Sequence, residues 1–263
     1  MKYGFIGCGN MGGAIAKALA KKTTDLMLTS KSGTSAQKLA EALGGTYAPS
    51  NETVASQCDV IFLAVKPQMI RGVMAPIAGI LQERKPLLVS MLAGFTLAQL
   101  QEMVGTPLPI IRIMPNTPAA IGKGLITYCV NEQVGDGQVR ELLKDLEGAG
   151  HFDPIDEKLM DVASAAAGCS PAYAYMFIEA MADGAVACGL PRAKALEYAA
   201  TAVAGAAEMV LQTGMHPGAL KDAVCSPGGS TIAGVKALEN GGFRGAVMDA
   251  IVAAYRKGQE LGK

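Results

Sequence analysis

The sequence predicts an α/β protein in which a doubly wound, mostly parallel sheet is followed by a second domain made of helices. Three observations predict this fold class. Short apolar runs alternate with helix-forming stretches in the first half of the chain, as strands alternate with crossover helices. A glycine-rich turn directly follows the first apolar run. From about Glu157 onward the strand pattern gives way to Ala-rich stretches with helical spacing.

The apolar runs are expected as strands because each is short and is bounded by polar or glycine-rich segments. Between them, Gly12 to Lys22 and Gln37 to Leu43 carry apolar side chains three and four positions apart, which is typical of helices packed on a sheet. The expected strands are residues 3–6, 26–29, 60–65, 87–90, 110–113 and 125–130.

The second half is expected to contain several helices, separated by turn signals at Gly189–Pro191, His216–Gly218, Pro227–Gly229 and Gly241–Gly242. So many alanines and glycines indicate helices that approach one another closely. We therefore assign residues 1–153 to the sheet domain and residues 154–263 to the helical domain.

Composition excludes several classes of partner. The 23 Lys and Arg residues balance the 23 Asp and Glu residues, and no basic stripe is present, so we expect no nucleic-acid partner. The longest uncharged stretches are short for a membrane span, and the N-terminus lacks a signal-peptide pattern, so we expect no membrane association and a cytoplasmic location. The 6 cysteines form no C-x-x-C motif and only 2 histidines are present, so we expect no metal site.

The turn after the first expected strand has the G-x-G-x-x-G pattern, in the strand-to-helix context that a Rossmann-type dinucleotide-binding domain requires. Its first glycine permits the sharp turn, the second lets the backbone approach a pyrophosphate, and the third lets helix and strand pack closely. Residues 1–153 are therefore predicted to bind a nicotinamide cofactor. The turn residues assigned to it are Gly7, Cys8, Gly9, Asn10, Met11 and Gly12.

The end of the second expected strand favours NADPH. Enzymes that prefer NAD usually carry an acid here for the ribose 2′-hydroxyl, whereas this chain has Ser30, Lys31 and Ser32, whose hydroxyls and cation suit a 2′-phosphate. A solvated loop cation is the alternative for Lys31. NADPH is the predicted cofactor, and NADH is left open as a second one.

A second turn, running from Ser226 through Pro227, Gly228 and Gly229 to Thr231, is expected to end one helix and begin the next. Free backbone N–H groups at such a helix start, beside the Ser230 and Thr231 hydroxyls, form a natural carboxylate site. Ordinary helix capping is the alternative, since Ser and Thr are common capping residues.

Four blocks in this order along the chain resemble the pyrroline-5-carboxylate reductase family, which performs the last step of proline biosynthesis. They are Phe5–Gly12, Ala64–Pro67, Met114–Pro118, and His216–Asp222 running into Ser226–Thr231. The resemblance implies an imine reductase that transfers hydride from NAD(P)H to the C=N bond of 1-pyrroline-5-carboxylate and forms L-proline. Only the small-molecule substrate and further copies of the chain are expected as partners.

The resemblance also implies roles for residues outside the glycine turn. It places Asn51, Ala64, Val65, Lys66 and Pro67 along the cofactor, and Met91, Leu92 and Ala93 at its nicotinamide end. It assigns Ser226, Gly229, Ser230 and Thr231 to the substrate, with Thr231 as the catalytic residue that hydrogen-bonds the ring nitrogen. It further implies that the helical domain intertwines with a second subunit, in a homodimer or larger assembly.

Two other functions remain open. A β-hydroxyacid-type dehydrogenase has a similar domain order but typically uses a lysine on its long interdomain helix, and no lysine occurs between Ala163 and Ala193. A non-catalytic NADPH-binding sensor would keep the glycine turn without turnover.

One departure from the family also stands out: Gly168-Cys169-Ser170 replaces Gly-Ser-Gly before Pro171, which puts in doubt the close backbone approach expected at the second glycine.

Overall fold

A computed structural model describes residues 1–261 of the chain. The chain divides into two compact units. Unit 1 contains Met1–Cys169 together with the C-terminal residues from Ala253 onward, and unit 2 contains Ser170–Val252. This division lies later in the chain than residues 153 and 154, where the sequence places the domain boundary. The boundary between a cofactor domain and a substrate domain therefore stays a prediction.

Unit 1 is built on a sheet of eight strands in the order β3-β2-β1-β4-β5-β6-β7-β8 within the described residues. The neighbouring strands are parallel except for β6 and β7, which are antiparallel. The strands are β1 (Tyr3–Ile6), β2 (Leu26–Thr29), β3 (Thr46–Tyr47), β4 (Val60–Leu63), β5 (Leu87–Ser90), β6 (Ile110–Met114), β7 (Gly124–Val130) and β8 (Gly150–Pro154).

The strand order confirms the doubly wound sheet. Because β1 lies between β2 and β4, the chain winds one way from β1 to β3 and the other way from β4 onward. Ligands of such sheets bind beside this switch point, at the carboxyl ends of the strands. Each expected strand is present. The sequence missed β3, which has only two residues, and β8, which lacks a clear apolar pattern.

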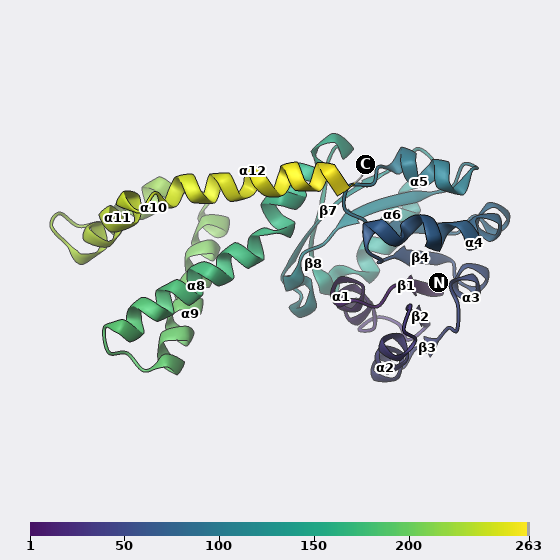
Figure 1. Ribbon diagram of the computed structural model, residues 1–263, viewed down its shortest axis with the longest axis horizontal. Coiled ribbons are helices and arrows are strands. Elements are labelled where there is room, and N and C mark those ends of the chain that lie inside the picture. The colour runs from purple at the N-terminus through teal and green to yellow at the C-terminus, as the bar shows by residue number, and fades with distance from the viewer. Residues whose placement is uncertain (262–263) are drawn as a thin grey trace. The chain divides into compact units, whose positions relative to one another are not determined.

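Helices cover both faces of this sheet (Figure 1). Ile61 and Leu63 pack into a core shared with α3, α4 and α5, whereas Val60 and Phe62 pack into a core shared with α1, α2 and α6. The Phe5 and Phe62 rings stack with their centroids 4.4 Å apart. The helices of unit 1 are α1 (Asn10–Leu19), α2 (Thr34–Leu43), α3 (Asn51–Gln57), α4 (Ile70–Arg84), α5 (Leu97–Val104), α6 (Asp136–Asp145) and α7 (Met160–Ala163).

Local chemistry sets the ends of these helices. Thr96 and Gln99 form a capping box at the start of α5: the Thr96 hydroxyl accepts the Gln99 N–H at 3.1 Å, and the Gln99 side chain accepts the Thr96 N–H at 2.9 Å. The helix ends at Gly105, whose φ of +83° is favourable only for glycine. Helix α1 begins two residues earlier than expected from the sequence, directly after Gly9.

Unit 2 is helical, as expected. Its helices are α8 (Ser170–Ala187), α9 (Arg192–Thr213), α10 (Pro217–Ala223), α11 (Ser230–Asn240) and the first part of α12 (Phe243–Leu261). Three of the four predicted turn signals fall between successive helices, and the fourth, His216–Gly218, begins α10 with His216 as its N-cap residue. Helices α8 and α9 pack side by side through Ala182, Ala195 and Ala199 (Figure 1).

Unit 2 has a very small core of its own. Among its described residues, the fully buried hydrophobic side chains are Ala182, Ala195 and Ala199. Large apolar side chains are instead exposed on its helices, including Met176, Leu211 (80% exposed) and Met248. A surface this apolar is normally covered by another protein surface.

Neither a membrane span nor a metal cluster is found in the part of the chain that the structure describes. None of its helices is both long and apolar enough to cross a bilayer. No group of three His, Cys, Asp or Glu side chains gathers there in an arrangement that could hold a metal ion.

Candidate functional site

The glycine turn connects β1 to α1, and each of its glycines has a distinct environment. Gly7 has a φ of +104°, and a Cβ there would lie 2.5 Å from the Ala64 carbonyl oxygen. A Cβ on Gly12 would lie 2.4 Å from the Gly7 carbonyl oxygen and 2.8 Å from the Ala64 Cβ. The first and third glycines thus allow the turn and the close packing of α1 against the segment that follows β4.

Gly9 differs from both, because a Cβ there would meet no atom within 4 Å. It is the N-cap residue of α1, and no side chain caps that helix. The N–H groups in the first turn of a helix have no acceptor within the helix, and they carry the positive end of its dipole. The space above Gly9 is therefore open to an anionic group, and a larger residue at this position would begin to fill it.

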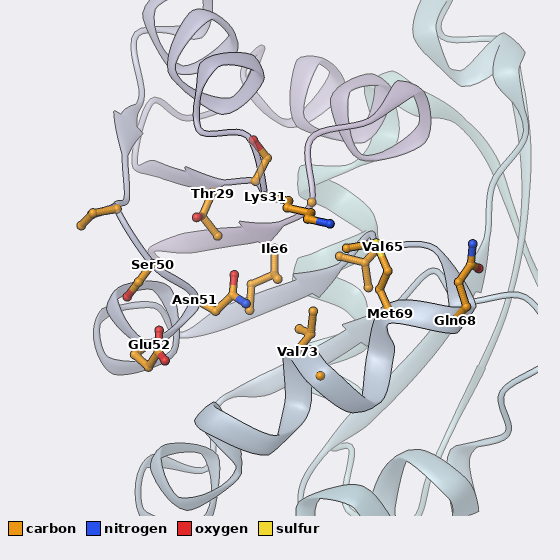
Figure 2. Close-up of a pocket in the computed structure, with 14 residues that line it drawn as sticks. Ile6, Thr29, Lys31, Ser50, Asn51, Glu52, Val65, Gln68, Met69 and Val73 are labelled. Carbon is orange, nitrogen blue, oxygen red and sulfur yellow. The ribbon is translucent and has the colours of Figure 1, made fainter.

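A cavity of about 520 Å³ lies beside this turn, at the carboxyl ends of β1, β2 and β4 (Figure 2). Of the residues predicted to bind the cofactor, it brings together Gly7, Ser30, Lys31, Asn51 and Val65. These residues come from three strand ends and the start of α3, so only the fold places them around one space. The cavity lies at the switch point where sheets of this type bind dinucleotides.

The Ser30–Ser32 segment is organised by Ser35, which the sequence analysis did not single out. The Ser30 and Ser35 hydroxyl oxygens are 2.8 Å apart, and those of Ser32 and Ser35 are 3.4 Å apart. The Ser30 hydroxyl also accepts the Ala36 N–H at 3.3 Å. Ser30 and Lys31 line the cavity, whereas Ser32 is not among its lining residues.

Cys8, within the glycine turn, is a half-buried thiol that is hydrogen-bonded to the backbone. Its Sγ donates to the Thr29 carbonyl oxygen at 3.4 Å. Burial raises the pKa of the Cys8 thiol to about 11, so it stays protonated at neutral pH. Its side chain thus ties the turn to the end of β2.

The segments after β4 and β5 contribute backbone more than side chains. Ala64 contacts the glycine turn, Val65 lines the cavity, and Lys66 and Pro67 begin the short 3₁₀ helix Pro67–Met69. The side chains of Met91 and Leu92, which follow β5, are buried in the two cores. Ala93 lines a separate cavity of about 210 Å³, together with Gly94, Asp161, Ser164 and Cys169 among others.

Several residues around the large cavity were missed by the sequence analysis. Ser50 caps α3 by accepting the Thr53 N–H at 3.2 Å, and Glu52 lies in the first turn of that helix. Such a capping serine is a recognisable signal, but β3 before it is too short to predict. The missed lining residues are Ile6, Thr29, Pro49, Ser50, Glu52, Gln68, Met69, Gly72 and Val73.

The Met114–Pro118 block is a structural clamp. Asn116 is buried, its side-chain N–H donates to the Ala167 carbonyl oxygen at 3.0 Å, and its side-chain oxygen accepts the Leu125 N–H at 3.1 Å. Ala167 belongs to a π-helical turn, Ser164–Gly168, that precedes α8. Asn116 thus holds the loop after β6 against this irregular turn, beside the cavity that Ala93 lines.

Arg112 reinforces the same region from within the sheet. Its guanidinium is almost completely buried and lies 2.7 Å from an Asp161 carboxylate oxygen and 3.5 Å from one of Glu157. Glu157 also accepts the Leu97 N–H at 2.6 Å. A buried cation needs such partners, since its desolvation is otherwise very costly.

The Ser226–Thr231 turn lies in unit 2 and has the backbone geometry expected of it. Gly228 has a φ of +71°, and Gly229 is the N-cap residue of α11, with no side-chain cap. The Gly229 N–H donates to the Ser226 carbonyl oxygen at 3.0 Å. A Cβ on Gly229 would lie 2.5 Å from the Ser226 hydroxyl oxygen. The start of α11 thus resembles that of α1, since both have a glycine N-cap and a positive-φ glycine, which lies one residue before the N-cap at α11 and two residues before it at α1.

The family models that match the chain cover both of its ends. The model described as "Pyrroline-5-carboxylate reductase dimerisation" matches residues 157–261. The model described as "NADP oxidoreductase coenzyme F420-dependent" matches residues 2–94. The first contains the Ser226–Thr231 turn and the second contains the glycine turn.

Curated relatives and solved structures agree with these models. The pyrroline-5-carboxylate reductase of Escherichia coli is 43% identical, over 100% of this chain and 98% of that protein, and the one of Glycine max is 42% identical, over 98% and 95%. The crystal structure of the Plasmodium falciparum enzyme with NADP bound has a TM-score of 0.90 at 36% identity, covering 100% of this chain and 98% of that one. The Streptococcus pyogenes enzyme has a TM-score of 0.91 at 37% identity, covering 99% and 98%.

Proposed function

Because this chain belongs to the pyrroline-5-carboxylate reductase family, we propose that it reduces the C=N bond of 1-pyrroline-5-carboxylate to L-proline with NADPH. It is an NADP-dependent oxidoreductase that acts on an imine. The observation that carries this function is the full-length match at 43% identity, which includes both glycine N-capped turns. The rival β-hydroxyacid-type chemistry has no lysine on α8 to perform it.

The residues of the cofactor cavity fit a dinucleotide. The open space above Gly9 and the uncapped start of α1, next to the cavity, suit a pyrophosphate. Ser30 and Lys31, which line the cavity, and the adjacent Ser32 suit a 2′-phosphate. Bound NADPH supplies the hydride. Asn51 and the Ala64–Pro67 segment hold the cofactor along the switch point.

At the nicotinamide end, Met91, Leu92 and Ala93 act through their backbone. The Met91 and Leu92 side chains pack into the protein cores, which fixes the path of this segment. A rigid segment after β5 keeps the reacting ring in one orientation. Such positioning is the main requirement for hydride transfer between two bound molecules.

The Ser226–Thr231 turn binds the substrate. The backbone N–H groups of Gly229 and Ser230 and the Ser226 hydroxyl hold the carboxylate at the start of α11. Thr231 hydrogen-bonds the ring nitrogen, where the proton must reside for the imine to accept hydride. A protonated cyclic imine is already a strong hydride acceptor, so no strong acid is needed from the protein.

The assembly is a homo-oligomer in which unit 2 is completed by a second copy of the chain. This proposal is supported by the small core of unit 2, which has three buried alanines, and by its exposed Met176, Leu211 and Met248. It is also supported by the dimerisation family model that matches residues 157–261. A homodimer is the smallest assembly that provides such cover. The cytoplasmic location and the absence of a nucleic-acid partner stay predictions from the sequence.

The function is tested by following NADPH absorbance with 1-pyrroline-5-carboxylate as substrate. We expect NADPH consumption with L-proline as the product. NADPH binding without consumption would instead favour a non-catalytic sensor. The same assay with NADH measures the cofactor preference.

Two substitutions test the substrate turn. Thr231→Ala is expected to lower kcat/KM by roughly ten- to a thousandfold, the effect of losing one transition-state hydrogen bond, with NADPH affinity unchanged. Ser226→Ala is expected chiefly to raise KM for the imine. The matched control is Thr24→Ala in the exposed loop between α1 and β2, which should leave both constants unchanged. Parental turnover by the Thr231→Ala variant would remove that residue from the mechanism.

A further inference from the structure

We propose that Glu52 is a specificity-determining residue that weakens the preference for NADPH over NADH. The sequence shows no acid at the end of β2, where NAD-preferring proteins usually carry one. The fold instead places an acid, Glu52 at the start of α3, in the lining of the cavity that Lys31 also lines. This inference rests on the proposed function, in which the cavity holds the adenosine end of the cofactor.

Glu52 and Lys31 share one cavity but come from different walls of it. Figure 2 shows Lys31 on the segment after β2 and Glu52 beside Ser50 and Asn51 at the start of α3. Both side chains line the same cavity of about 520 Å³, so a 2′-phosphate bound near Lys31 shares this space with the Glu52 carboxylate.

The Glu52 carboxylate is anionic at neutral pH. Hydrogen bonds from its own backbone N–H and from the Ser50 hydroxyl hold the pKa of this carboxyl below its usual value. These bonds also keep the side chain against the start of α3. A negative charge thus lines the same cavity as the cation of Lys31.

NADPH and NADH differ only at the ribose 2′ position, which is the group proposed to lie nearest the charges of Lys31 and Glu52. A 2′-phosphate brings about 1.5 to 2 negative charges, by analogy with other phosphate monoesters, and is repelled by a carboxylate. The 2′-hydroxyl of NADH is neutral and donates a hydrogen bond to one. Glu52 therefore opposes Lys31, and the pair sets how far the enzyme discriminates between the cofactors.

The size of the effect follows from solvent exposure. Because Glu52 is exposed, water screens its charge, and Coulomb's law with a dielectric constant of about 40 to 80 and an assumed separation of about 10 Å gives a modest repulsion. Removing the charge should raise the ratio of NADPH to NADH association constants about two- to eightfold at about 10 mM salt. The rise should shrink to less than about twofold at about 0.5 M salt.

The test compares Glu52→Gln with Glu83→Gln in the full-length protein. Glu83 is exposed near the end of α4 and does not line the cavity, so its variant has the same net charge change without the proposed effect. Both nucleotides are titrated by fluorescence at low and high salt, and thermal unfolding confirms that each variant is folded. We expect the ratio to rise only in Glu52→Gln.

The outcomes separate this inference from the proposed function. An unchanged ratio in Glu52→Gln, or a rise that persists at high salt, would overturn the role of Glu52. If Glu52→Gln has no such effect but Lys31→Asp still lowers NADPH affinity, the proposed cofactor site is supported and only the role of Glu52 is wrong. If the parent protein binds neither nucleotide, the proposed function itself is wrong.

Discussion

Replacing Gly9 by alanine should weaken cofactor binding and leave the free energy of unfolding nearly unchanged. Gly9 has φ −75° and ψ −170°, which alanine adopts without strain, and its Cβ would meet no protein atom within 4 Å. Alanine is a poorer N-cap residue than glycine, but it also restricts the unfolded chain. These opposing effects leave the free energy of unfolding within about 1 kcal/mol of the parent value.

The cofactor should be affected far more. The added methyl group enters the open space above Gly9, where we propose that the pyrophosphate approaches the start of α1. Losing one charge-assisted hydrogen bond to a backbone N–H costs about 1.5–3 kcal/mol, which corresponds to roughly 10- to 150-fold weaker binding. We expect this loss for NADPH and NADH alike, because they share the pyrophosphate.

Two other glycines provide the comparison. A Cβ on Gly12 would lie 2.4 Å from the Gly7 carbonyl oxygen, so Gly12→Ala must displace backbone and should lower the free energy of unfolding by about 1–3 kcal/mol or more. Gly79 lies in α4 with open space around it, and Gly79→Ala should raise that free energy by about 0.5–1 kcal/mol. Gly79→Ala should leave cofactor affinity unchanged.

The assays are urea unfolding followed by circular dichroism, and titration of NADPH fluorescence. The reasoning is refuted if Gly9→Ala binds NADPH within twofold of the parent protein. It is also refuted if Gly9→Ala loses as much stability as Gly12→Ala, because Gly9 would then be a packing residue.

Three further predictions follow from particular contacts. Lys31→Asp should weaken NADPH much more than NADH in the same titration, and an equal loss of both would contradict a 2′-phosphate contact. The thermal unfolding midpoint should rise with protein concentration, because a second copy is proposed to cover unit 2; a midpoint independent of concentration would argue against an obligate assembly. Burial raises the pKa of the Cys58 thiol from 9.0 to about 11, so its contribution to stability is fully present below pH 9 and is lost as pH rises toward 11. Urea unfolding at pH 8 and pH 10.5 should show this decrease, and Cys58→Ala should reduce it.

Much of the fold could be predicted because its elements are encoded locally. Strands buried on both faces, such as Val60–Leu63, are continuous apolar runs and can be recognised without any knowledge of their neighbours. The turn signals of unit 2 rely on Gly and Pro, whose backbone preferences are intrinsic. The short edge strand β3 had no such signal, because a two-residue strand depends on pairing with β2.

The candidate site was predictable only in part. The glycine turn could be assigned because its three glycines are required by backbone geometry, and the chain order places them between a strand and a helix. Glu52, Ser35 and Gln68 carried no comparable signal. Their place around the cofactor cavity, or beside Ser30, depends on how α2, α3 and the segment after β4 pack on the sheet.

By itself, the sequence determined that a dinucleotide turn and a second helix-start turn exist in one chain, since both depend on short-range glycine chemistry. Only the tertiary structure decided which side chains share the cavity with that first turn. Residues 6, 31, 52 and 65 are far apart along the chain. The parallel register of β1, β2 and β4 brings the segments of residues 6, 31 and 65 to one edge of the sheet, and the packing of α3 adds residue 52. The charges that face a bound cofactor are therefore set by strand order and helix packing, which no local pattern specifies.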